Sequence, residues 1–215
     1  MGGGSVGRVL GVCTALAALH SLLASKPAKD LVSRIVGPRY RNGLYRFAFN
    51  AKSVLFLVWA TWWFLRLPDR EIYRVRLPWS LLFRAGQVAS LGMLLSAVRV
   101  IGVLDFAGIS QLRSLLAGLD PDPEPEAQGP PLGADGQMVT AKPFGLNRHP
   151  SNLGALGVFL FFPRITANRV TLATLVALYS VLGSLHEELR LRLAYGEPFE
   201  QYQREVPFFI PRLRR

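Results

Sequence analysis

The sequence predicts an all-α, polytopic integral membrane protein, and three observations lead to that prediction. Half of the 215 residues are apolar, and only 18% are charged. The mean hydropathy is positive, at +0.26, which is unusual for a water-soluble domain. The apolar residues are also gathered into separate stretches, each about long enough to cross the hydrocarbon core of a bilayer as a helix.

Five transmembrane helices are expected from these stretches, and the fourth is the shortest: 8–25, 43–66, 84–107, 149–163 and 168–186. The turn between the last two covers only Pro163 to Asn168, so these two helices should be antiparallel neighbours. Small residues on the fourth stretch, Gly154, Ala155 and Gly157, should allow close packing against another helix.

The remaining segments complete a single domain, residues 1–215. Residues 118–141 are rich in proline, glycine and acidic side chains, which predicts a flexible loop. Residues 142–215 then hold the last helical hairpin and a C-terminal amphipathic part, interrupted at Gly196 and ending before Pro207. We expect this part to fold back on the cytoplasmic membrane surface as a cap over the hairpin.

The net charge of +11 is better explained by the orientation of the helices in the membrane than by nucleic-acid binding, because the basic residues lie mostly between or after the apolar stretches. One side of the membrane receives the loop with Lys26 to Arg46, the loop with Arg113 to Arg148, and the basic C-terminus. The other side receives fewer cations, with Arg66 to Arg84 as its main group. The positive-inside rule therefore predicts an outer N-terminus and a cytoplasmic C-terminus.

Polar residues gather at the predicted cytoplasmic mouth of the last hairpin. Arg148 and His149 begin the fourth stretch, and His186, Glu187 and Glu188 end the fifth. Antiparallel packing brings both groups together into a polar pocket. Neighbouring helical positions point about 100° apart, so one of the two glutamates should face the pocket while the other pairs with an arginine.

Two other interpretations compete with a catalytic pocket. A metal site is not favoured, since neither a His-x-x-x-His nor a Glu-x-x-His pair occurs on one helix, and Cys13 is the only cysteine. An ion-pair network of Arg148, Glu187 and Glu188 that only locks the hairpin explains the residue types as well as a functional pocket does.

The order and spacing of the C-terminal residues resemble a known superfamily. The motif runs Asn147-Arg148-His149-Pro150-Ser151-Asn152-Leu153-Gly154, then Glu187-Glu188, Tyr195-Gly196-Glu197, Phe199, Tyr202, Val206-Pro207 and Ile210-Pro211. This pattern resembles the isoprenylcysteine carboxyl methyltransferase superfamily over about 70 residues. In the first half, His20-Ser21-Leu22-Leu23-Ala24, Tyr45-Arg46 and Leu104-Asp105-Phe106 are similar to its NnrU and methanethiol S-methyltransferase branch.

The resemblance implies a cytosol-facing pocket for S-adenosylmethionine and an apolar acceptor that enters from the bilayer. It implies catalytic roles for Arg148, Glu187 and Glu188. The cofactor-binding residues that it implies are His149, Pro150, Leu153, Gly154, Tyr202, Val206, Pro207 and Ile210. For a thiol acceptor, His149, His186 or Arg148 would lower the thiol pKa.

Departures from the superfamily pattern bear on the acceptor. Asn152 replaces the usual aromatic residue after His-Pro-x, Phe199 stands where the first tyrosine of the last motif is expected, and Gly183 replaces an arginine that precedes the glutamate pair. We therefore expect a small or lipophilic thiol, or else a carboxyl group, rather than a prenylcysteine. The alternative is a non-catalytic NnrU-type membrane protein that retains the fold and is accessory to nitrogen-oxide metabolism.

Overall fold

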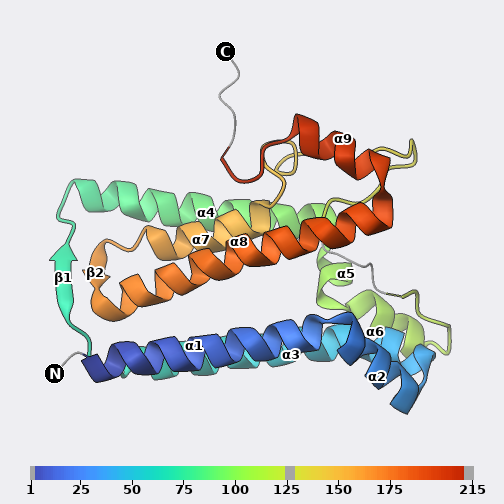
Figure 1. Ribbon diagram of the computed structural model, residues 1–215, viewed down its shortest axis with the longest axis horizontal. Coiled ribbons are helices and arrows are strands. Elements are labelled where there is room, and N and C mark those ends of the chain that lie inside the picture. Colours follow the sequence, from blue (N-terminus) through green and yellow to red (C-terminus); the bar gives the residue numbers. More distant parts are fainter. Residues whose placement is uncertain (1–2, 124–128, 211–215) are drawn as a thin grey trace. The chain divides into compact units, whose positions relative to one another are not determined.

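The computed structural model describes residues 3–123 and 129–210, and it is mostly helical (Figure 1). Four helices are long and apolar enough to cross a membrane: α1 (Gly3–Ala24), α3 (Pro38–Leu65), α4 (Trp79–Ile101) and α8 (Ala167–Tyr195). They correspond to the first, second, third and fifth predicted stretches. Part of the predicted flexible loop, residues 124–128, lies outside the described residues, as do Arg212, Arg214 and Arg215 of the charge count.

The prediction of five spanning helices is wrong at the fourth stretch. There the structure has α7 (Pro150–Leu160), an 11-residue helix. At 1.5 Å per residue, this helix is about 16 Å long, roughly half the thickness of the hydrocarbon core. The apolar run continues to Phe162, but Pro163 cannot donate a helical hydrogen bond, and the chain is extended before α8 begins.

The all-α prediction also needs correction, because two short strands pair antiparallel: β1 (Glu71–Arg74) and β2 (Arg164–Thr166). Their pairing satisfies backbone groups that the short α7 leaves outside a helix. It is extended by hydrogen bonds from the Val75 N–H to the Pro163 carbonyl, 2.8 Å, and from the Ala167 N–H to the Arg70 carbonyl, 3.0 Å. Backbone pairing of this kind is required near a bilayer, where unpaired groups are costly.

The chain divides into two compact units, and the first comprises Met1–Asp69 and Val103–Pro125. In it, α3 packs against α1, α2 (Lys26–Val36), α5 (Val103–Ala107) and α6 (Ile109–Leu116). Arg46 Nε and Asn50 Nδ2 both donate to the Phe106 carbonyl, at 3.1 and 2.7 Å, which fixes the end of α5 on α3. The third predicted span, 84–107, is displaced in the structure: α4 runs from Trp79 to Ile101, and Gly102, with φ of 99°, redirects the chain into α5.

The second unit comprises Arg70–Gly102 and Glu126–Arg215 and contains the candidate site residues. Within it, α7 lies between α4 and α8 and packs against both, as Figure 1 shows. This confirms that the fourth and fifth stretches are antiparallel neighbours. Gly154 faces α4 so closely that an added Cβ would lie 2.6 Å from the Ser90 carbonyl oxygen and 2.8 Å from the Leu94 nitrogen.

Beyond α8, the chain turns at Gly196 into α9 (Glu197–Glu205), which packs back on α8. A buried apolar cluster holds this end of the unit together: Met138, Leu191, Phe199, Tyr202 and Val206. The described part of the predicted flexible loop is thus not free of packing, because Met138 is only 6% exposed. The Tyr202 hydroxyl donates to the Phe144 carbonyl at 2.8 Å, and burial raises the pKa of Tyr202, so this donor stays protonated.

A glycine pair in the second unit tests the close contact of α7 with α4. Gly154→Ala should lower the free energy of unfolding by about 1–3 kcal/mol, since its methyl group meets backbone atoms that cannot turn away. Gly183→Ala is the matched control, because nothing lies within 4 Å of an added Cβ there. The control should be neutral or stabilising by about 0.5–1 kcal/mol. Denaturant unfolding in detergent micelles measures both, and equal effects would contradict this packing.

Candidate functional site

The segment before α7 fixes two of the predicted site residues in place. Asn147 is fully buried, and its side-chain Oδ1 accepts a hydrogen bond of 3.1 Å from the His149 N–H. Pro150 occupies the first turn of α7, where its missing N–H costs nothing and its fixed φ favours a helix start. Arg148 and His149 are therefore held directly at the N-terminus of α7.

Arg148 joins three parts of the second unit. Its Nε lies 2.6 Å from Glu188 Oε1 on α8, and the two side chains are only 13% and 11% exposed. Its Nη1 donates to the carbonyls of Gln203, at 2.9 Å, and Val206, at 2.6 Å, at the end of α9. Its backbone N–H donates to the Pro207 carbonyl at 2.9 Å. One guanidinium thus connects the start of α7 to α8, α9 and the C-terminal segment.

His149 lies between the two predicted carboxylates. Its Nε2 is 3.0 Å from Glu188 Oε1, and its Nδ1 is 3.3 Å from Glu187 Oε2. Burial of the ring favours the neutral imidazole, but hydrogen bonds and charge attraction from both glutamates outweigh it, so the pKa of His149 is raised. The imidazolium is the form in which both ring nitrogens donate to a carboxylate.

Gln203 completes the network, and the sequence analysis did not identify it. Its Nε2 donates to Glu188 Oε2 at 2.8 Å, so both oxygens of that carboxylate are engaged. Its Oε1 in turn accepts a hydrogen bond of 2.9 Å from Arg192 Nη2. A glutamine in a nine-residue polar helix carries no signal of its own, because its role depends on how α9 folds back against α8.

Two aromatic residues of the C-terminal segment cover the network. The Phe208 ring centroid lies 4.9 Å from that of His149 in an edge-to-face arrangement, and the Phe209 centroid lies 6.1 Å away. The Arg148 guanidinium carbon is 5.5 Å from the centroid of Phe208. These rings exclude water from one side of the charged groups, which strengthens the electrostatic interactions beneath them.

The structure brings together Arg148, His149, Glu187 and Glu188, and it corrects two details of their predicted arrangement. Both carboxylates reach His149, instead of one facing the site alone, because the ring presents a nitrogen to each. His186 is exposed on α8. No group of three or more His, Cys, Asp and Glu residues suited to a metal ion occurs among residues 3–123 and 129–210.

The predicted cofactor-binding residues divide between the site and its surroundings. Pro150 is buried at the start of α7, and Val206 and Pro207 contribute their carbonyls to Arg148. Tyr202 lies in the apolar cluster, and Leu153 is half-buried on α7. Gly154 faces α4, as described above, and Ile210 is 83% exposed.

Asn152, which departs from the superfamily pattern, has a partner one turn along α7 from His149. Its Nδ2 donates to Ser184 Oγ on α8 at 2.8 Å, and Ser184 is completely buried. Ser184 itself lies one turn before Glu188. A neutral interhelical hydrogen bond therefore follows the charged network along the interface between α7 and α8.

The chain is distantly homologous to methanethiol S-methyltransferases. It is 26% identical over 204 residues to that of Pseudomonas deceptionensis, an alignment that covers 94% of this chain and 71% of the relative. It is also 26% identical over 208 residues to the methanethiol S-methyltransferase of Crocosphaera subtropica, and this alignment covers 94% of this chain and 73% of the relative. Methanethiol S-methyltransferase 2 of Bradyrhizobium diazoefficiens is 35% identical over 66 residues, which cover 31% of this chain and 26% of the relative. No protein-family profile matches the chain. No solved structure matches it either.

The buried ion pair of the site should dominate the stability of the second unit. Arg148→Ala leaves Glu188 buried without its guanidinium, and the free energy of unfolding should fall by about 3–5 kcal/mol. Arg204→Ala removes an exposed arginine of α9 and should change the free energy of unfolding by less than about 0.5 kcal/mol. Urea or thermal unfolding in micelles measures both variants, and similar losses in the two would show that the pair contributes little.

The raised pKa of His149 makes stability depend on pH. The contribution of the imidazolium is fully present below the ordinary histidine pKa of about 6.5 and is lost as the pH rises through the higher pKa of the folded state. The unfolding midpoint should therefore decrease over this range above pH 6.5. His149→Asn should flatten this part of the profile, and an unchanged profile in this variant would assign the titration to another group.

Proposed function

We propose that the protein is an S-adenosylmethionine-dependent membrane methyltransferase that methylates a small or lipophilic thiol. The observation that carries the proposal is the distant homology to methanethiol S-methyltransferases over 94% of the chain. The geometry supports it, since Arg148, His149, Glu187 and Glu188 converge under an aromatic cover at one end of the second unit. The positive-inside count favours a cytoplasmic position for this end.

The residues at the site fit a sulfonium cation. A carboxylate attracts such a cation in a water-poor environment, and an aromatic face stabilises it further. Glu188 already binds Arg148, His149 and Gln203, whereas Glu187 has a contact to His149 Nδ1 and remains 17% exposed. We therefore assign Glu187 and the rings of Phe208 and Phe209 to the methyl donor. When bound there, S-adenosylmethionine would supply an electrophilic methyl group for the acceptor.

The remaining residues position and activate the acceptor in this proposal. In this proposal, the positive charge of the His149 imidazolium lowers the pKa of an acceptor thiol through space, without a hydrogen bond from the ring. His149 itself does not act as the base, because both of its ring nitrogens face carboxylates. The thiol proton is released to water in this proposal, because Glu187 is engaged by the methyl donor and Glu188 is fully paired. Arg148 keeps Glu188, and through it His149, in a fixed position.

A second candidate function follows from the complete pairing of Glu188. A network in which Arg148, His149 and Gln203 occupy both carboxylate oxygens also suits a hairpin lock without catalysis. This corresponds to the non-catalytic NnrU-type membrane protein. The two candidates differ in one measurable property, the binding of S-adenosylmethionine.

Calorimetry of the purified protein in nanodiscs with S-adenosylmethionine tests the proposal. The native protein should bind, and Glu187→Gln should weaken binding about tenfold or more, since it removes a charge that faces the sulfonium. Glu200→Gln is the matched control, because it makes the same change on the exposed face of α9. A folded native sample that binds no S-adenosylmethionine favours the hairpin lock.

The acceptor is tested separately, with a labelled methyl donor and a panel of methanethiol, longer-chain thiols, phenols, carboxylic acids and prenylcysteines. We expect transfer to thiols and a base-stable thioether product. A base-labile methyl ester as the main product would instead establish the carboxyl group as the acceptor.

A further inference from the structure

Arginines gather at the end of the second unit that lies away from the candidate site. This end is formed by β1, β2 and the first turns of α4 and α8 (Figure 1). Segments 70–84 and 163–169 contain one carboxylate, Glu71, and six arginines: Arg70, Arg74, Arg76, Arg84, Arg164 and Arg169. The charge is therefore strongly positive and local.

Glu71 is already occupied by two of these arginines. It receives two hydrogen bonds from Arg74, at 3.2 and 2.7 Å, and one from Arg164 Nε, at 2.7 Å. Arg84 binds the neutral Gln87 side chain, at 3.0 Å. Among the residues that the structure describes, neither Arg76 nor Arg84 forms an ion pair with a carboxylate. The single carboxylate of these two segments thus cannot balance their six arginines.

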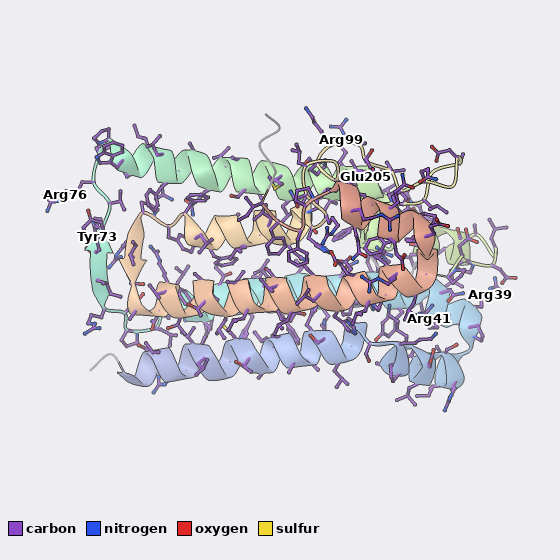
Figure 2. The ribbon with its side chains drawn as sticks, turned by 45° about the horizontal axis from the view of Figure 1, so that its top comes forward. Arg39, Arg41, Tyr73, Arg76, Arg99 and Glu205 are labelled. Carbon is purple, nitrogen blue, oxygen red and sulfur yellow. The ribbon has the colours of Figure 1, made fainter. Side chains whose placement is uncertain are left out.

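An open hollow of about 1120 Å³ lies beside these arginines. Its lining combines Glu71 and Arg74 of β1 and Arg76, which follows β1, with Trp79 and Phe83 from the start of α4. Tyr73 and Arg76 project from the outer edge of the unit in Figure 2. Trp79 is 65% exposed, although it is one of the largest apolar side chains. The hollow therefore offers cations and an apolar wall side by side.

We propose that this hollow binds the headgroup of an anionic phospholipid. The phosphate group lies between Arg74 and Arg76, and the first part of an acyl chain runs along Trp79 and Phe83. The position supports this occupant, because α4 and α8, both long enough to span a membrane, begin at this end. Exposed tryptophan and tyrosine beside arginine are typical of the depth at which headgroups lie.

The apolar wall distinguishes a phospholipid from the other phosphate-bearing ligands. A nucleic acid or free phosphate would use the arginines but would leave Trp79 and Phe83 in contact with water. A zwitterionic lipid would use the apolar wall but carries a cation that the arginines repel. The combination favours a lipid with a net negative headgroup.

Native mass spectrometry of the detergent-purified full chain tests the proposal with phosphatidylglycerol and phosphatidylcholine of the same acyl composition. The native protein should bind phosphatidylglycerol at least about tenfold more tightly, and the preference should be lost in Arg74→Gln/Arg76→Gln. Arg99→Gln/Arg204→Gln is the matched control, since it removes two exposed arginines elsewhere in the same unit. Arg76→Gln alone leaves every ion pair of Glu71 intact, so it covers the case in which the double variant fails to fold.

Three results would overturn the proposal: equal binding of the two lipids, an equal loss of preference in the control variant, or competition by inorganic phosphate or an oligonucleotide that matches phosphatidylglycerol. A preference for phosphatidylglycerol that disappears only in the variants at residues 74 and 76 would support it. None of these outcomes depends on methyl transfer.

Discussion

The ion pair between Arg148 and Glu188 is the interaction on which the candidate site depends. Charged groups with about a tenth of their surface exposed must be fully paired, since the cost of desolvating them is otherwise not recovered. Arg148 meets this requirement by donating to Glu188 and to carbonyls at the end of α9. The same bonds determine where α9 and residues 206–207 lie. The cap over the hairpin is therefore positioned by the residues that it covers.

This pairing also assigns different chemistry to two adjacent glutamates. Glu188 is held by Arg148, His149 and Gln203, so it acts as a fixed anion. Glu187 is reached from one side by His149 and is partly exposed on the other. Neighbouring positions on one helix thus provide a structural carboxylate and an accessible one.

Hydropathy predicted the four long helices. The short turn after residue 163 predicted that α7 and α8 are antiparallel, and motif spacing predicted that Arg148 and His149 lie beside the glutamate pair. They failed where the outcome depends on distant partners. The run through residues 149–163 is apolar but only 15 residues long, which is short for a span, and hydropathy does not detect that Pro163 ends helical pairing. Strand β1 has only four residues, all exposed, so no alternation of buried and exposed side chains marks it, and it is completed by pairing with β2. The role of Gln203 in the charged network and the burial of Met138 both depend on α9 folding back against α8, which the sequence pattern does not show.

The short α7 explains how a charged site can lie within a helical hairpin of a membrane protein. From Ala167 to Glu188, α8 extends about 32 Å, close to the thickness of the hydrocarbon core. If α8 starts at one interface, its glutamates therefore reach the other, where charge is tolerated. One turn deeper, the hydrogen bond between Asn152 and Ser184 is polar but uncharged. Polarity thus decreases stepwise from the charged network along the interface between α7 and α8.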